Sequence, residues 1–146
     1  MREVVPESRT YSFYGYARLG DFLEPRLLLR LAAFLNPKSV WLAEGSPDFF
    51  RKALEAVDSS IRILHTPDSI PKAELVVAAY DDVISGFLRE SVAAAGHAML
   101  LFCNPLEADR VADFVCEAMP GGVALCGREY IICVSRDTGP LHRYAI

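Results

Sequence analysis

The chain has 146 residues, 52% of them hydrophobic and 23% charged, with a formal net charge of −4 and a pI near 5.3. These values predict one globular domain over residues 1–146 with its own hydrophobic core, and they exclude a disordered chain. The acidic balance argues against a nucleic-acid partner, and no apolar run is long enough for a membrane span. The first residues also lack the apolar core of a signal peptide, so we expect a cytoplasmic protein.

Residues 1–20 form an arm that is rich in aromatic side chains but carries little core pattern. Four aromatic residues lie in it, Tyr11, Phe13, Tyr14 and Tyr16. They could cover a ligand pocket, pack against the domain's own core, or pack against a neighbouring subunit. These roles stay open on the sequence alone.

Short apolar strands then alternate with amphipathic helices. The first helix is predicted over Pro25–Leu35, because leucines recur on one face and Asn36-Pro37 stops it. The elements predicted after it are, in order, a strand at Ser39–Ala43, a helix at Pro47–Val57, strands at Ile61–Leu64 and Glu74–Ala79, a helix from Asp81 or Asp82 to about Ala95, a strand at Ala98–Cys103, a helix from Leu106 to about Met119, and a hairpin of two strands at Val123–Cys126 and Tyr130–Ser135.

Strands that are apolar on both faces and alternate with helices are typical of a parallel sheet covered on both sides. Four such strands and a final antiparallel hairpin predict an α/β fold, a Rossmann-like three-layer sandwich with a mostly parallel sheet. Right-handed crossovers place the strand-to-helix loops together at the carboxyl edge of the sheet, which is the usual ligand site of this architecture. These loops are Glu44–Asp48, His65–Asp68, Tyr80–Asp82 and Asn104-Pro105.

The arrangement resembles class I S-adenosylmethionine-dependent methyltransferases over roughly residues 26–136. Leu28–Phe50 is similar to the family's lead helix, first strand and cofactor loop. Glu74–Asp82 is similar to its fourth strand with the polar residues that follow, and Gly122–Ser135 to its reversed last strand. The resemblance implies S-adenosylmethionine as cofactor, held by Glu44 and Gly45, and places Asp81 toward the methyl acceptor.

The cofactor loop departs from the family's pattern of closely spaced glycines. Gly45 matches one glycine, but Ala43 and Pro47 stand at the neighbouring positions, and Trp41 stands near an acidic one. Pro47 has no backbone N–H and a fixed φ. At the end of the second strand, where the family has an acidic ribose ligand, this chain has His65.

Only nine residues, His65–Ala73, separate the second predicted strand from the third. The family fits a helix and a further strand there, and nine residues cannot hold both. The sequence therefore predicts a compact version that lacks this unit or replaces it from another subunit.

Each candidate site residue also has a purely structural interpretation. Glu44 and Gly45 could line a ligand loop, although Gly45 also permits a tight turn. His65 could contact a base or ribose, act as a general base, or be a surface residue. Tyr80 is a further candidate cofactor contact. Asp81 beside it is the candidate catalytic residue, and helix capping would explain Asp81 without any chemistry.

The four cysteines form no C-x-x-C pair, and the three histidines have no metal-ligand spacing, so no metal site is expected. Buried thiols, a disulfide or a reactive thiol stay open. The chain has no Gln, two Asn, and twelve Arg against three Lys. This bias is typical of thermophilic proteins, and genome base composition can produce the same bias.

Two functions follow from these observations. The favoured one is a methyltransferase-like domain with an eroded cofactor site, acting as a non-catalytic scaffold, regulatory subunit or weak nucleotide-type binder. The alternative is an active compact S-adenosylmethionine-dependent methyltransferase. High apolar content in so short a chain predicts a homo-oligomer or a protein partner, and an adenosyl-type molecule is the candidate small ligand.

Overall fold

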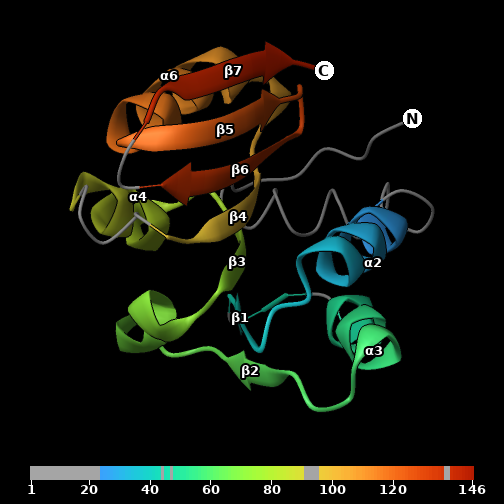
Figure 1. The fold of residues 1–146 in the computed structure, drawn as a ribbon. Helices are drawn as coiled ribbons and strands as arrows, with labels where there is room; N and C mark the ends of the chain where they lie inside the picture. Colours follow the sequence, from blue (N-terminus) through green and yellow to red (C-terminus); the bar gives the residue numbers. More distant parts are fainter. Residues whose placement is uncertain (1–23, 44, 47, 91–95, 137–138) are drawn as a thin grey trace.

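The computed structural model describes residues 24–146 except 44, 47, 91–95 and 137–138 (Figure 1). The aromatic N-terminal arm, Glu44 and Pro47 therefore lie outside the described residues. The elements in chain order are α2 (Glu24–Leu35), β1 (Ser39–Leu42), α3 (Asp48–Val57), β2 (Arg62–Leu64), the 3₁₀ helix η1 (Pro67–Lys72), β3 (Leu75–Ala79), α4 (Asp82–Arg89), β4 (Ala98–Phe102), the 3₁₀ helix η2 (Pro105–Glu107), α6 (Ala108–Ala118), β5 (Gly121–Cys126), β6 (Tyr130–Arg136) and β7 (Leu141–Ala145).

All seven of these strands form one sheet in the order β2-β1-β3-β4-β6-β5-β7. The first four strands in that order pair in parallel. β6 is antiparallel to both of its neighbours, β4 and β5, and β7 is parallel to β5. Every described strand except β6 therefore runs in the same direction, which confirms the mostly parallel α/β sheet with an antiparallel region near the C-terminus.

Helices cover both faces of the sheet and make the three layers that the sequence predicts. α2 and α3 lie together on one face, where Leu28, Phe50 and Leu54 are completely buried. α4 and α6 lie on the other face, where Ile84 and Val115 are buried (Figure 1). β3 and β4 lie between the layers, and all their residues are buried. Burial on both faces explains why these strands are continuous apolar runs.

The segment between β2 and β3 contains a 3₁₀ helix and no further strand. η1 leads directly from β2 at the edge of the sheet to β3 on the far side of β1. Ile70 anchors η1, because its side chain is 2% exposed in the core. The nine-residue spacing therefore predicts the local structure correctly, and the sheet begins with β2 where a larger protein of this architecture would add another strand.

Most predicted boundaries fall within two residues of the structure, but one helix end and one strand differ more. The helix after Asp81 ends at Arg89, because Glu90 takes non-helical φ and ψ of −90° and 87°. The rest of the range predicted for that helix includes 91–95, which lie outside the described residues. β7 was not predicted at all, and it places the β5–β6 hairpin inside the sheet and not at its edge.

Candidate functional site

Two cavities open at the carboxyl edge of the sheet. The β1–β2 cavity has a volume of about 350 Å³, and the β3–β4 cavity about 390 Å³. β1 and β3 are neighbours in the sheet, so both cavities belong to the same edge. The β1–β2 cavity is lined by Leu42, Ala43, Gly45, Ser46, Asp48, Arg51, His65, Thr66 and Pro67. The β3–β4 cavity is lined by Tyr80, Asp81, Asp82, Ser85, Arg89, Cys103, Asn104, Glu107, Arg110, Val111 and Phe114.

A tight turn after β1 shapes the first of these cavities. Gly45 has a φ of +87°, a conformation that residues with a Cβ adopt only with strain. The Ser46 amide donates to the Ala43 carbonyl at 3.1 Å, and the Ser46 hydroxyl donates to the same carbonyl. The turn leads into α3, whose first turn carries the exposed Asp48. The glycine is therefore needed for the turn itself, whether or not a ligand approaches it.

Trp41 holds the opposite wall of the β1–β2 cavity in place. Its indole Nε1 donates to the carbonyl of Thr66 at 2.8 Å, and its side chain is 3% exposed. Thr66 lines the cavity between His65 and Pro67. The residue that stands near the family's acidic position thus serves as a structural anchor. The sequence signal for this role is a lone tryptophan inside an apolar strand, and strand periodicity alone does not say which loop its ring reaches.

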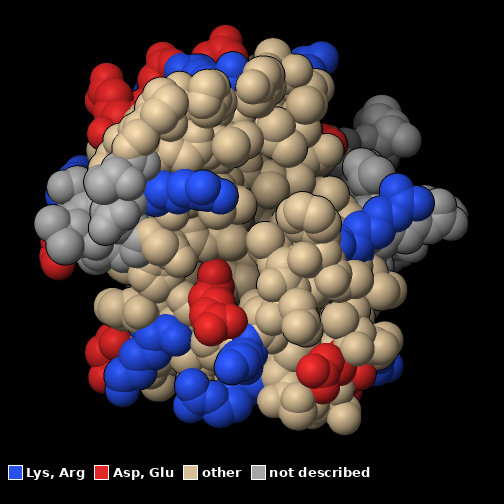
Figure 2. All heavy atoms as spheres, in the orientation of Figure 1, with Lys and Arg blue, Asp and Glu red and all other residues tan. Residues whose placement is uncertain are grey.

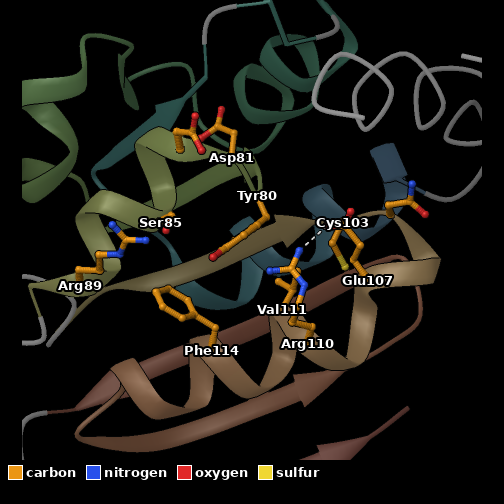
Figure 3. Close-up of a pocket in the computed structure, with 11 residues that line it drawn as sticks. Tyr80, Asp81, Ser85, Arg89, Cys103, Glu107, Arg110, Val111 and Phe114 are labelled. Carbon is orange, nitrogen blue, oxygen red and sulfur yellow. Dashed lines mark hydrogen bonds and ion pairs between the residues drawn. The ribbon is translucent and has the colours of Figure 1, made fainter. Parts of the chain in front are cut away.

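Tyr80 is the central side chain of the β3–β4 cavity. Its backbone amide donates to the Phe102 carbonyl at 2.7 Å, which fixes it beside the end of β4. Its ring meets Phe114 of α6 edge to face, with ring centroids 6.0 Å apart. Figure 3 shows Tyr80 between Arg89 and Arg110, with Phe114 beneath it. The cavity therefore has an aromatic floor and charged side chains around it.

Asp81 is committed to a helix cap. It has extended backbone, and its carboxylate accepts a hydrogen bond from the Ile84 amide at 3.0 Å. This geometry is that of an N-cap, which satisfies one of the amides that every helix start leaves free. Asn104 caps η2 in a similar way, because its side chain accepts a hydrogen bond from the Leu106 amide. Both polar residues after the central strands therefore have structural tasks.

The charges around the β3–β4 cavity are mixed. Arg110 forms an ion pair with Glu107 at 2.7 Å, and both side chains are well exposed, so the pair adds little to stability. Arg89 and Asp82 bring one charge each from opposite ends of α4. The strand-end pattern that identified Tyr80 and Asp81 misses these arginines, because both lie within helices.

Cys103 is a poor nucleophile in this setting. Burial raises the pKa of its thiol to about 11, and the negative charges of Glu107 and Glu129 act in the same direction. Burial also raises the pKa values of Cys116 and Cys133. No disulfide joins the four cysteines, all of which lie in the described part of the chain. The buried thiols of Cys103, Cys116 and Cys133 are therefore protonated near neutral pH and pack as small apolar groups.

The structure divides the candidate site residues between the two cavities. Gly45 and the exposed His65 line the β1–β2 cavity, while Tyr80 and Asp81 line the β3–β4 cavity. Glu44 lies outside the described residues. Among the residues that are described, no three His, Cys, Asp or Glu side chains gather in a way that could hold a metal ion. None of the described helices combines the length and apolarity needed to cross a bilayer.

No protein-family model matches the sequence, and no curated protein is significantly similar to it. The strand order and the paired cavities thus define the chain as an α/β protein of Rossmann-like topology, and no narrower family is identified.

Proposed function

We propose that this chain is a methyltransferase-like domain whose cofactor site is eroded, and that it serves as a scaffold or regulatory subunit that binds a nucleoside-type ligand weakly. The β1–β2 cavity carries the proposal. It lies beside β1, and the chain places β2 on one side of this strand and β3 on the other. Ligands of open α/β sheets usually bind at such a topological switch point. The proposed ligand is an adenosine derivative lying against Gly45 and His65.

Weak binding follows from what lines this cavity. Its one described carboxylate, Asp48, sits in the first turn of α3, where it interacts favourably with the helix dipole. After β2 the residue available to a ribose is His65, a poorer acceptor for two hydroxyl groups than a carboxylate. Pro47 has no amide hydrogen to offer a ligand. We therefore expect dissociation constants of about 0.1 to 5 mM for adenosyl compounds.

A non-catalytic role is supported by the β3–β4 cavity, where a methyl acceptor would sit. The Asp81 carboxylate already accepts from the helix amide of Ile84, and the pKa of Cys103 is raised to about 11. The Cys103 thiol is therefore no base near neutral pH, and one oxygen of Asp81 is already engaged in the cap. The alternative, an active methyltransferase, would use the second carboxylate oxygen of Asp81 while the first keeps the cap.

Titration calorimetry with S-adenosylhomocysteine and adenosine 5′-monophosphate tests the proposal. Arg51→Ala and His65→Ala should each weaken binding about three- to tenfold, because both side chains line the cavity. Lys52→Ala is the matched control, since Lys52 is an exposed neighbour on α3 that does not line it. The control should bind as the unaltered protein does. Micromolar binding together with methyl transfer to any acceptor would favour the enzyme, and no heat up to 10 mM ligand would remove the binding role.

A further inference from the structure

β7 is the last strand of the sheet in the described part of the chain. It pairs with β5 on one side, and no other described strand lies along its outer side. Residues 142–146 are all exposed. The opposite edge strand, β2, has only three residues, and so short an edge offers little for further pairing. β7 has five residues and no proline or bulge within it.

The hydrogen bonds at the two ends of β7 define which backbone groups face outward. Gly122 donates to the Pro140 carbonyl at 3.1 Å, and Ile146 donates to the Cys126 carbonyl at 3.0 Å. In a parallel pair, alternate residues of a strand direct both backbone groups toward the same neighbour. Even-numbered residues of β7 therefore face β5, and Leu141, Arg143 and Ala145 direct their N–H and C=O groups away from the sheet.

We propose that these outward groups pair with the β7 strand of a second copy of this chain. The two strands would run antiparallel about a two-fold axis perpendicular to the sheet, which joins the two sheets into one. This symmetry keeps the α6 sides of both copies on the same face, so a residue can lie opposite only one whose number has the same parity. The inference concerns β7, which lines neither cavity, and does not depend on ligand binding.

Charge selects the register. An axis through Arg143 would place Arg143 opposite itself, and like charges directly opposite destabilise a strand pair. An axis through Tyr144 places each Arg143 opposite Ala145 of the second copy, and these two residues exchange backbone hydrogen bonds. Arg143 then keeps its ion pair with Asp113 of α6 at 2.9 Å.

Apolar side chains on the other face add to this arrangement. Val123, Tyr144 and Ile146 are 37%, 53% and 59% exposed. Figure 1 shows no described helix in front of β5, β6 and β7 on the face opposite α6, and Figure 2 shows a largely uncharged surface there. In the proposed register Tyr144 contacts its counterpart, and Ile146 lies beside His142 of the second copy. A contact of one short strand is smaller than a standard interface, so we expect a reversible dimer with a dissociation constant of about 10 to 100 µM.

Sedimentation analysis of the ligand-free protein from 1 to 500 µM measures the dimer. Ala145→Pro removes an outward N–H without touching the bonds to β5, and it should weaken the dimer at least tenfold. Ala145→Thr keeps the N–H and should leave the dimer intact. Tyr144→Lys, at an exposed position that a folded monomer tolerates, should also abolish dimerisation by placing two cations together. A protein that stays monomeric at 500 µM would overturn the proposal, as would a dimer that withstands both disruptive changes.

Engineered cysteines test the register itself. Residue 144 and its counterpart would form a non-hydrogen-bonded pair with Cα atoms about 4.5 Å apart, a separation that a disulfide spans. Tyr144→Cys should therefore give a covalent dimer with oxidised glutathione, whereas Arg143→Cys, which lies opposite Ala145, should not. Equal crosslinking of both variants, or none of either, would contradict the register. Ligand titrations of the β1–β2 cavity read out separately, so failure of the dimer leaves the proposed function untouched.

Discussion

At the scale of single residues, the buried hydroxyl of Ser135 lowers the stability of the fold. Its hydroxyl is a buried side-chain polar atom with no hydrogen-bond partner in the described part of the chain, and the residue is 1% exposed. Burying a hydroxyl without a partner costs free energy that its removal recovers. We therefore expect Ser135→Ala to raise the free energy of unfolding by about 1 kcal/mol in urea titrations.

Ser39 provides the matched control for Ser135. It is 3% exposed, but its hydroxyl donates to the Lys72 carbonyl and accepts from the Glu74 amide, each at 3.1 Å. Ser39→Ala should therefore lower the free energy of unfolding by about 1 to 2 kcal/mol. Equal effects of the two substitutions would show that hydrogen bonding does not decide their sign.

Because of Cys103, the free energy of unfolding should fall at alkaline pH. The pKa of its thiol is about 11 in the folded chain, against an ordinary value of 9.0. The unfolded chain therefore loses this proton first, so the stabilising contribution is complete below pH 9 and is lost as the pH rises toward 11. At pH 10 the loss amounts to about 1.4 kcal/mol. In urea titrations, the free energy of unfolding should fall between pH 7 and pH 10 by about 1.4 kcal/mol less in Cys103→Ala than in the unaltered protein. Identical falls in the two proteins would contradict the account.

At the scale of elements, the backbone requires a glycine at one position, Gly122, but not at another, Gly86. A Cβ on Gly122 would lie 2.0 Å from the Val134 carbonyl oxygen, and Gly122 has a φ of +115°. Gly122→Ala should therefore destabilise the β5–β6 pair by about 3 kcal/mol or more. Gly86 lies exposed within α4 and has open space around it, so Gly86→Ala should stabilise by about 0.5 to 1 kcal/mol. Thermal unfolding followed by circular dichroism measures both, and a mild effect at Gly122 would mean that β5 can shift.

The buried elements were predictable and the exposed edge was not. β3 and β4 are buried on both faces, so their sequences are unbroken apolar runs that allow one interpretation. β7 is exposed over almost its whole length, so its sequence needs no apolar pattern and Leu-His-Arg-Tyr-Ala gives none. Its position depends on backbone pairing with β5, which leaves no periodic signal in the side chains.

At the scale of the whole molecule, topology brings the candidate residues to one edge but the sequence does not say how they divide. Gly45 and His65 share one cavity because they follow the neighbouring strands β1 and β2. Tyr80 lines the other cavity because it follows β3, which pairs with β4 on the side away from β1. The sequence did not indicate that Trp41 supports a wall of the β1–β2 cavity or that Arg89 lines the β3–β4 cavity. Strand periodicity assigns a residue to a face, but it does not show which loop or helix from elsewhere in the chain meets it there.

The central claim is that an adenosine derivative binds weakly in the β1–β2 cavity, and amide chemical-shift mapping tests it most directly. Adding S-adenosylhomocysteine to the isotope-labelled protein should shift the amides of Gly45, Ser46, His65 and Thr66 in fast exchange, with half-saturation at about 0.1 to 5 mM. Tyr80 and Arg89 should move little. Shifts centred on the β3–β4 cavity, slow exchange with saturation at micromolar ligand, or no shifts at 10 mM would each contradict the account.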